Sequence, residues 1–200
     1  MTVSITPCWK NHLRQALGLF CCLFWLGVAQ AAVPGAPGSI EPKSARLEPE
    51  GSGQVLTAEF SIALGARFED AVARGVVLPF RFEFTLTRTR KYWMDEHVTG
   101  RLIEFRLGYQ ALTRQYRLTQ GNSHLNFDTL DEALKALGRV NRLPVIDKGH
   151  VVPGESYRAA VRLSLDRNQL PKPLQVDALA DRDWHIEART RQWEFVPGDK

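Results

Sequence analysis

The stretch FRFEFTLT, residues 80–87, decides the fold class of this chain. Apolar and polar side chains alternate in it with a period of two, as in a β-strand that has one buried and one solvated face. Such one-sided alternation is typical of antiparallel sheets, whereas parallel sheets buried on both faces read as continuous runs of Val, Ile and Leu. The stretch therefore predicts an antiparallel strand that places three phenylalanines and a leucine in a core.

The same alternation recurs along the rest of the chain. It is found in residues 56–62, 103–110, 115–119 and 157–166. Near the C-terminus the apolar residues change parity between Ala188 and Trp193, so we expect a bulge or bend near Arg191. Strands thus account for most of the predicted secondary structure.

Two short amphipathic helices are predicted between the strands. One begins after Thr129, which forms a capping box with Glu132, and it ends at Gly138. The other runs from Phe68 to Arg74 and is shorter. Together with the strands, these helices predict a mainly β fold: an antiparallel curved sheet or open sandwich with two short helices packed against it.

The first 31 residues have the three-part design of a secretory signal peptide. Lys10 and Arg14 are the only charged residues before the small-x-small sequence at 29–31, and the apolar run 16–29 separates them from it. Because that run is shorter than the roughly 20 residues that span a bilayer, we expect cleavage near Ala31 and a periplasmic or secreted location. The alternative is that the protein stays anchored in the inner membrane by an uncleaved N-terminus.

The remainder of the chain divides simply. Residues 32–43 are rich in Pro and Gly and are predicted to form a flexible leader, and residues 44–197 a single β-rich domain. All three cysteines lie in the predicted signal, so the mature domain is expected to be cysteine-free and to form no disulfide or thiolate site. Removing Lys10 and Arg14 from the 26 basic residues leaves 24 against 22 acidic ones, a balance that argues against nucleic acid as a partner.

One local cluster of aromatic and charged residues lies between two strongly predicted strands. It consists of Tyr92, Trp93, Asp95, Glu96 and His97. A polar hairpin connection explains it most simply, but aromatic side chains with flanking charges are also the composition of protein interfaces. We therefore take it as a candidate interaction loop, with acid–base chemistry by its last three residues as the remaining alternative. Adjacent side chains point in different directions, so we predict no metal site.

Catalytic signatures are absent from the sequence. It contains no Gly-x-Ser-x-Gly elbow, no phosphate-binding glycine loop and no His-Glu-x-x-His, so neither an enzyme nor a cofactor is predicted. Arginine recurs on the polar faces of the predicted strands. These arginines either form cross-strand ion pairs with glutamates, which is the simpler explanation, or line a groove for an acidic ligand. These arginines include Arg81, Arg88, Arg90, Arg101, Arg106, Arg114, Arg117, Arg158 and Arg162.

Several stretches, taken as a set, resemble the DUF4390 family of proteobacterial proteins of unknown function. They are ARGVVLPFRFEF, RKYWMDE, GYQALTRQYRL, FDTLDEALKALG, SYRAAVRLSLD and LPKPLQV, and the likeness runs from Leu56 to Trp193. The resemblance implies a secreted or periplasmic protein and carries over no activity or site residue. It also implies genes near membrane sensor kinases, so the expected partner is an unknown envelope protein, with a membrane sensor kinase as one candidate.

Three functions remain open at this point. The first is a non-enzymatic periplasmic binding or accessory module that acts through protein–protein contacts, either at a sheet edge or at the 92–97 loop. The second is a carrier of an apolar ligand or lipid held between the sheet and its helices. Its pocket would be lined by Phe80, Phe82, Phe84, Phe105 and Tyr109. The third is an enzyme of unknown reaction.

Overall fold

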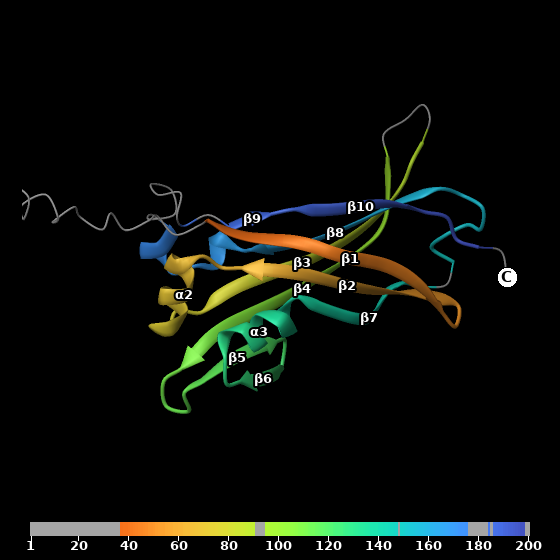
Figure 1. Ribbon diagram of the computed structural model, residues 1–200. Helices are drawn as coiled ribbons and strands as arrows, with labels where there is room; N and C mark the ends of the chain where they lie inside the picture. Colours follow the sequence, from red (N-terminus) through yellow and green to blue (C-terminus); the bar gives the residue numbers. More distant parts are fainter. Residues whose placement is uncertain (1–36, 91–94, 148, 176–183, 185, 199–200) are drawn as a thin grey trace, which may run out of the picture. The chain divides into compact units, whose positions relative to one another are not determined.

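Strands predominate in the computed structural model, which describes residues 37–90, 95–147, 149–175, 184 and 186–198, and they form two open sheets (Figure 1). The four-stranded sheet has the order β7-β2-β1-β9 and consists of β1 (Gly38–Glu50), β2 (Gly53–Ala63), β7 (Arg139–Ile146) and β9 (Ile186–Ala188). The six-stranded sheet has the order β10-β8-β3-β4-β5-β6 and consists of β3 (Leu78–Arg88), β4 (Glu96–Gln110), β5 (Gln115–Gln120), β6 (Ser123–Phe127), β8 (Tyr157–Leu165) and β10 (Thr190–Phe195).

The prediction of a mainly β, antiparallel fold is confirmed. Among the described strands every ladder is antiparallel except that of β1 with β9, which is parallel. The predicted strand 80–87 lies within β3, which pairs with β4 on one side and with β8 on the other. β3 is therefore an interior strand of the larger sheet, as its apolar face predicts.

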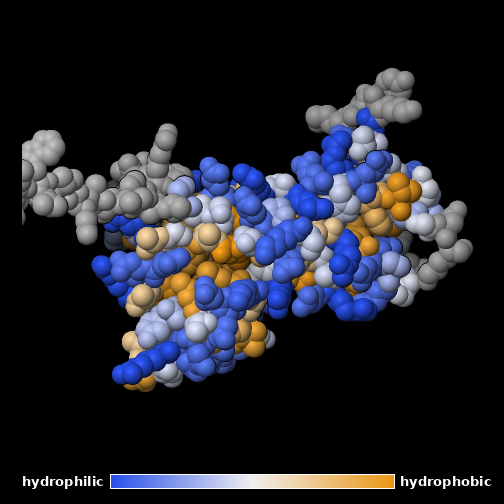
Figure 2. Space-filling view, viewed as in Figure 1, coloured by the Kyte–Doolittle hydropathy of each residue, from blue (hydrophilic) through white to orange (hydrophobic). Residues whose placement is uncertain are grey.

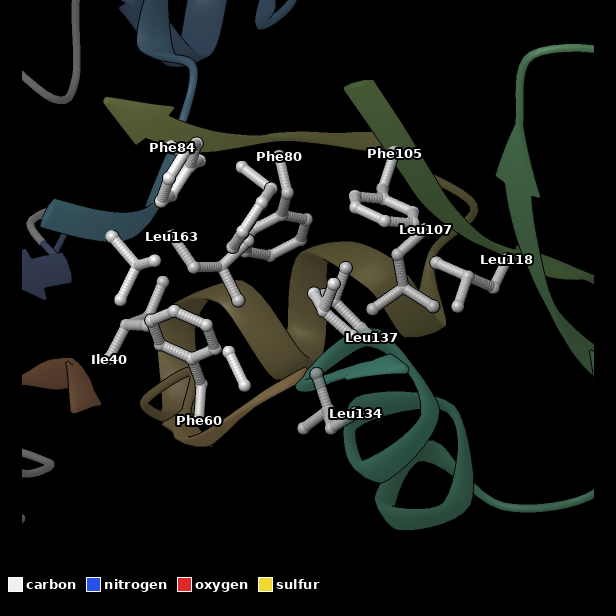
Figure 3. Packing of buried hydrophobic residues seen from close by; sticks show 14 of the residues in the cluster. Ile40, Phe60, Phe80, Phe84, Phe105, Leu107, Leu118, Leu134, Leu137 and Leu163 are labelled. Atoms are coloured by element: carbon white, nitrogen blue, oxygen red, sulfur yellow. The ribbon is translucent and has the colours of Figure 1, made fainter. Parts of the chain in front are cut away.

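The core lies where the inner faces of the two sheets meet the two predicted helices, α2 (Ala66–Ala73) and α3 (Leu130–Leu137). The alternation of β3 sends Phe80, Phe82, Phe84 and Leu86 inward, and none of them is more than 1% exposed. Figure 3 shows side chains of β3, β4 and α3 projecting into this one interior. Across the sheets, the ring of Phe60 in β2 meets that of Phe82 edge to face, with centroids 6.0 Å apart. Burying each such ring contributes about 1.5–3 kcal/mol to the free energy of unfolding.

Both predicted helices are confirmed, as α2 (Ala66–Ala73) and α3 (Leu130–Leu137). The hydroxyl oxygen of Thr129 accepts a hydrogen bond from the backbone N–H of Glu132 at 3.3 Å, which is half of the predicted capping box. At the other end of α3, the carbonyl of Gly138 accepts a 2.8 Å hydrogen bond from the backbone N–H of Phe60. A Cβ on Gly138 would lie 2.5 Å from the Phe60 carbonyl oxygen, so this close approach of helix and sheet requires glycine.

The prediction of a flexible leader over residues 32–43 is wrong for residues 38–43, which form the first part of β1. Ile40 is fully buried there, and the strand pairs with β2 from Ser39 to Glu50. Pro42 is tolerated inside this strand because the register shifts between Pro42 and Ser44, and such an irregularity needs no ladder hydrogen bond from the proline. The predicted domain boundary at residue 44 therefore falls six residues too late.

The C-terminal part of the chain passes from one sheet to the other. β9 pairs with β1 in the smaller sheet, and β10 pairs with β8 in the larger one. The change occurs at Arg189, whose backbone N–H donates to the carbonyl of Ile40 at 3.0 Å. This bend, two residues before Arg191, accounts for the change of parity in the sequence. It also joins the two sheets along one side (Figure 1).

No helix in the described residues has the length and apolar character needed to cross a bilayer. The predicted signal peptide, residues 1–31, lies outside the described residues and stays a prediction.

Candidate functional site

The candidate interaction loop lies in the connection between β3 and β4, and the ends of these two strands that lead into it bend away from the neighbouring strands (Figure 1). The structure describes Asp95, Glu96 and His97, whereas Tyr92 and Trp93 lie outside the described residues. All three described residues are exposed, and β4 begins at Glu96. The described part of the candidate site is therefore the base of the hairpin.

Arg88, the last residue of β3, is the centre of an ionic network at this base. Its Nε atom lies 2.8 Å from a carboxylate oxygen of Glu155, and its Nη1 atom lies 3.7 Å from one of Glu96. Its Nη2 atom donates to the hydroxyl of Tyr157 at 3.3 Å, and its guanidinium lies 5.6 Å from the centroid of that ring. The hydrogen bond to Tyr157 and the nearby carboxylates raise the pKa of Arg88.

The network has a buried anchor. Tyr157, the first residue of β8, is fully buried, and its hydroxyl accepts a hydrogen bond from the backbone N–H of Val152 at 2.9 Å. The same hydroxyl donates to Glu155 at 3.3 Å. Tyr157 belongs to the core and is hydrogen-bonded to Arg88, so it connects the ionic contacts of the exposed hairpin with the packed interior of the sheet.

The carboxylates of the candidate loop are both paired with arginines. Asp95 lies 2.9 Å from Arg158 of β8, and Glu96 pairs with Arg90 as well as with Arg88. Paired carboxylates of this kind neutralise and position arginines, which is a bracing role for the hairpin. In the part of the chain that the structure describes, no three histidine, cysteine or carboxylate side chains gather as metal ligands would.

A hollow of about 450 Å³ opens beside the hairpin base, between β8 and the edge strand β10. Its lining includes Trp193, which is half-buried, and a rim of polar and charged side chains. These are Thr89, Arg158, Gln192 and Glu194. This surface could not be predicted from the sequence, because it forms only when β10 pairs with β8 and Trp193 lies opposite Ala159. The alternation within one strand does not specify which strand it pairs with.

The residues predicted to line a pocket for an apolar ligand are mostly interior. Phe80, Phe82 and Phe84 are at most 1% exposed, and Phe105 is 7% exposed. Tyr109 is half-buried, with its ring centroid 5.0 Å from that of Tyr116. These side chains fill the space between the sheets and form part of the packed core.

Apolar surface remains on the side of the molecule where the two sheets are open. A groove of about 410 Å³ there is lined by the apolar residues Ile103, Phe105, Leu118, Leu125, Ala136, Val140 and Leu143, together with polar residues. Leu125 of the edge strand β6 is 59% exposed. In Figure 2, apolar side chains also gather between β2 and α3, where Phe60, Ile62 and Leu134 line a second depression with a charged rim.

The sequence model of a domain of unknown function, DUF4390, matches residues 38–194. The chain belongs to the DUF4390 family. The family match begins at the first residue of β1 and ends within β10, so the DUF4390 domain comprises both sheets. No curated protein and no solved structure matches the chain.

Proposed function

We propose that this DUF4390 protein is a non-enzymatic periplasmic accessory module that binds an envelope protein through the base of its β3–β4 hairpin. The observation that carries the proposal is the juxtaposition of a braced hairpin and a hollow lined by Trp193. Tryptophan and arginine are the residues that dominate binding energy at interfaces, particularly when they line a pocket with a polar rim. This surface offers both.

The bracing supports binding in a second way. A loop that is ordered before binding loses less conformational freedom when a partner docks, so more of the contact energy appears as affinity. Arg158 and Arg88 hold the two carboxylates of the hairpin on this side of the molecule, and Tyr157 fixes Arg88 to the core. The hairpin is thus held in place at its base before any partner arrives.

The location and the partner rest on the sequence. The secretory signal predicted for residues 1–31 supports a periplasmic site of action, with a membrane-anchored form as the alternative. A membrane sensor kinase is one candidate partner, because the DUF4390 resemblance implies neighbouring genes of that class. The near balance of charge in the mature chain supports a protein rather than a nucleic acid as the partner.

A carrier of an apolar ligand is the second candidate function. The groove on the open side of the sheets supports it, because seven of its lining residues are apolar and Leu125 is largely exposed. An enzyme has less support, because Asp95 and Glu96 are engaged by arginines.

Cross-linking in intact cell envelopes tests the hairpin surface. The full-length chain would be recovered from cross-linked envelopes with three variants: Gln192→Arg, Trp193→Ala and Leu112→Arg. Gln192 is exposed and lines the hollow, so Gln192→Arg fills the hollow without touching the core. We expect both hollow variants to lower recovery of a specific envelope protein at least fivefold. Leu112, which is 99% exposed in the β4–β5 turn, is the matched control and should leave recovery unchanged.

A charge swap separates bracing from direct contact. Asp95→Arg alone places two positive charges together and should lower recovery, whereas Asp95→Arg combined with Arg158→Asp restores the pair and should recover much of it. Equal recovery by every variant would show that the hairpin base is not the binding surface. An intact mass of the recovered chain that carries a noncovalent apolar ligand, with no protein partner, would favour the carrier.

A further inference from the structure

A polar hollow opens at the point where the chain passes between the sheets. The pairing of β10 with β8 ends at Thr190, which lies opposite Arg162. The preceding strand, β9, does not pair with β8 but with β1 of the smaller sheet. The last residues of β8 consequently have no strand partner on that side among the described strands. The gap is a hollow of about 330 Å³, bounded by β3, β8, the 3-10 turn η1 (Arg167–Gln169) and β9.

Arginines from three different elements line this hollow. Arg81 comes from β3, Arg162 from β8 and Arg167 from η1, and the polar residues Ser164 and Asn168 also line the hollow. The two carboxylates in the lining are Glu83 and Asp166. Sequence positions 81 and 162 were both predicted on polar strand faces, but only the pairing of β3 with β8 brings them to one place.

Asp166 is committed to the protein itself. Its side chain is 6% exposed and lies 2.6 Å from Arg81, and it also accepts hydrogen bonds from the backbone N–H of Asn168 at 3.1 Å and from the amide of Gln169 at 3.0 Å. These contacts use the carboxylate to orient Arg81 and to shape the turn that carries Arg167. Asp166 therefore builds the hollow and is not free to bind a cation in it.

The other arginines have unused binding capacity. In the described part of the chain, no carboxylate lies within 4.0 Å of the guanidinium of Arg162 or Arg167, and neither makes a side-chain hydrogen bond. The Nε atom of Arg81 is buried and has no hydrogen-bond partner. A guanidinium presents its N–H groups as a planar fork that matches the oxygens of a carboxylate or phosphate. Among the described residues, the guanidinium groups of Arg162 and Arg167 and the Nε–H of Arg81 therefore have no acceptor, and all three arginines line one hollow.

We propose that this hollow binds the anionic group, carboxylate or phosphate, of a small polar ligand. Its volume lies at the small end of ligand sites, which run from about 300 to 1,000 Å³. Glu83 lies directly opposite Arg162 in the β3–β8 ladder and bounds the anionic site on one side. The site is separate from the hairpin surface, because its residues on β8 begin at Arg162, whereas the hairpin base contacts Tyr157 and Arg158 at the start of that strand.

Titration of the full-length chain with inorganic phosphate, and separately with citrate, tests the proposal. Chemical shifts of the Ser164 and Asn168 amides and of the arginine Nε–H groups would report binding at the hollow. We expect a saturable response to one of these anions that is weakened at least tenfold in the double variant Arg162→Gln/Arg167→Gln. The matched control Arg106→Gln/Arg117→Gln removes the same charge from the same sheet outside the hollow and should change affinity less than twofold.

Two further comparisons distinguish a lipid headgroup from a free anion and define the results that would contradict the proposal. Cosedimentation with vesicles containing phosphatidylglycerol, lost in the hollow variant but not in the control, would assign the phosphate to a lipid headgroup. Binding of phosphate or citrate without cosedimentation would assign a free small anion. Equal weakening in both double variants would reduce the effect to general charge attraction and overturn the proposal, as would the absence of saturable binding to every probe.

Discussion

Asp166 and Arg81 form a partly buried ion pair, and the loss of Asp166 should measurably destabilise the protein. Asp166→Ala leaves the guanidinium of Arg81, whose side chain is 35% exposed, without its partner and removes the side-chain acceptor of the η1 turn. Breaking a buried pair by deleting one member is costly because the other charge stays behind. Since Arg81 retains some access to water, we expect the free energy of unfolding to fall by about 2–3 kcal/mol in urea titrations.

The exposed ion pair of α2 is the control for this prediction. Asp70 lies 2.8 Å from Arg74, but the two side chains are 58% and 75% exposed. Asp70→Ala should therefore change the free energy of unfolding by less than about 0.5 kcal/mol. If both substitutions had the same small effect, the Asp166 pair would contribute no more than a surface pair.

Sequence reasoning at this scale identified side chains but not their partners. It placed Asp95 and Glu96 in a polar connection and Arg158 on a polar strand face, and the structure joins Asp95 to Arg158, 63 positions along the chain. It expected arginines to pair with glutamates across neighbouring strands. Arg81, with Glu104 opposite in the ladder, pairs instead with Asp166 at the end of β8. Alternation specifies a face of the sheet, whereas the partner depends on long-range register.

The N-terminal cap of α3 makes a testable contribution at the scale of the element. Thr129 accepts from the backbone N–H of Glu132, one of the donors that a helix start leaves without a partner. Thr129→Ala should lower the free energy of unfolding by about 1 kcal/mol, measured by thermal or urea unfolding. Thr129→Ser keeps the hydroxyl and should restore most of the loss. A Ser variant as unstable as the Ala variant would mean that the methyl group, rather than the cap, matters.

The elements that could be predicted are those in which every local signal agrees. β3 combines alternation with aromatic and β-branched residues, and α3 combines a cap, an apolar stripe and a glycine stop. β1 and β7 went unpredicted because Pro42 and Pro144 argue against a strand. The structure accommodates Pro42 at a register shift and Pro144 in an edge strand, beside an irregularity where Arg142 has a positive φ of 46°. Both solutions depend on the neighbouring strands, which the local sequence does not specify.

The arrangement of the whole molecule depends on the passage of the chain between its sheets. Fold class could be predicted, because one-sided alternation favours antiparallel sheets, but the division into sheets of four and six strands could not. That division is made at Arg189, where β9 and β10 take different partners. The same divergence opens the arginine-lined hollow, so the proposed anion site follows from the way the two sheets are joined.

The two sheets should unfold as one cooperative unit, because residues of both belong to a single core. Phe82 of the larger sheet is fully buried and packs against Phe60 of the smaller one. Phe82→Ala should therefore lower the stability of both sheets equally, by about 3–5 kcal/mol, since it removes contacts and leaves a cavity. Native-state hydrogen exchange measures this directly through the slowest backbone amides of β2 and β3.

Leu112→Ala is the control, because Leu112 is 99% exposed and its truncation should leave the exchange of both strands unchanged. If Phe82→Ala accelerated exchange in β3 while β2 kept its protection, the smaller sheet would be a separate cooperative unit. The joint at Arg189 would then be a hinge between two independently stable sheets, and the hollow beside it would change shape as they moved. Equal loss in both strands would instead mean that the shared core holds the arginines of the hollow in fixed positions, as binding of a small anion requires.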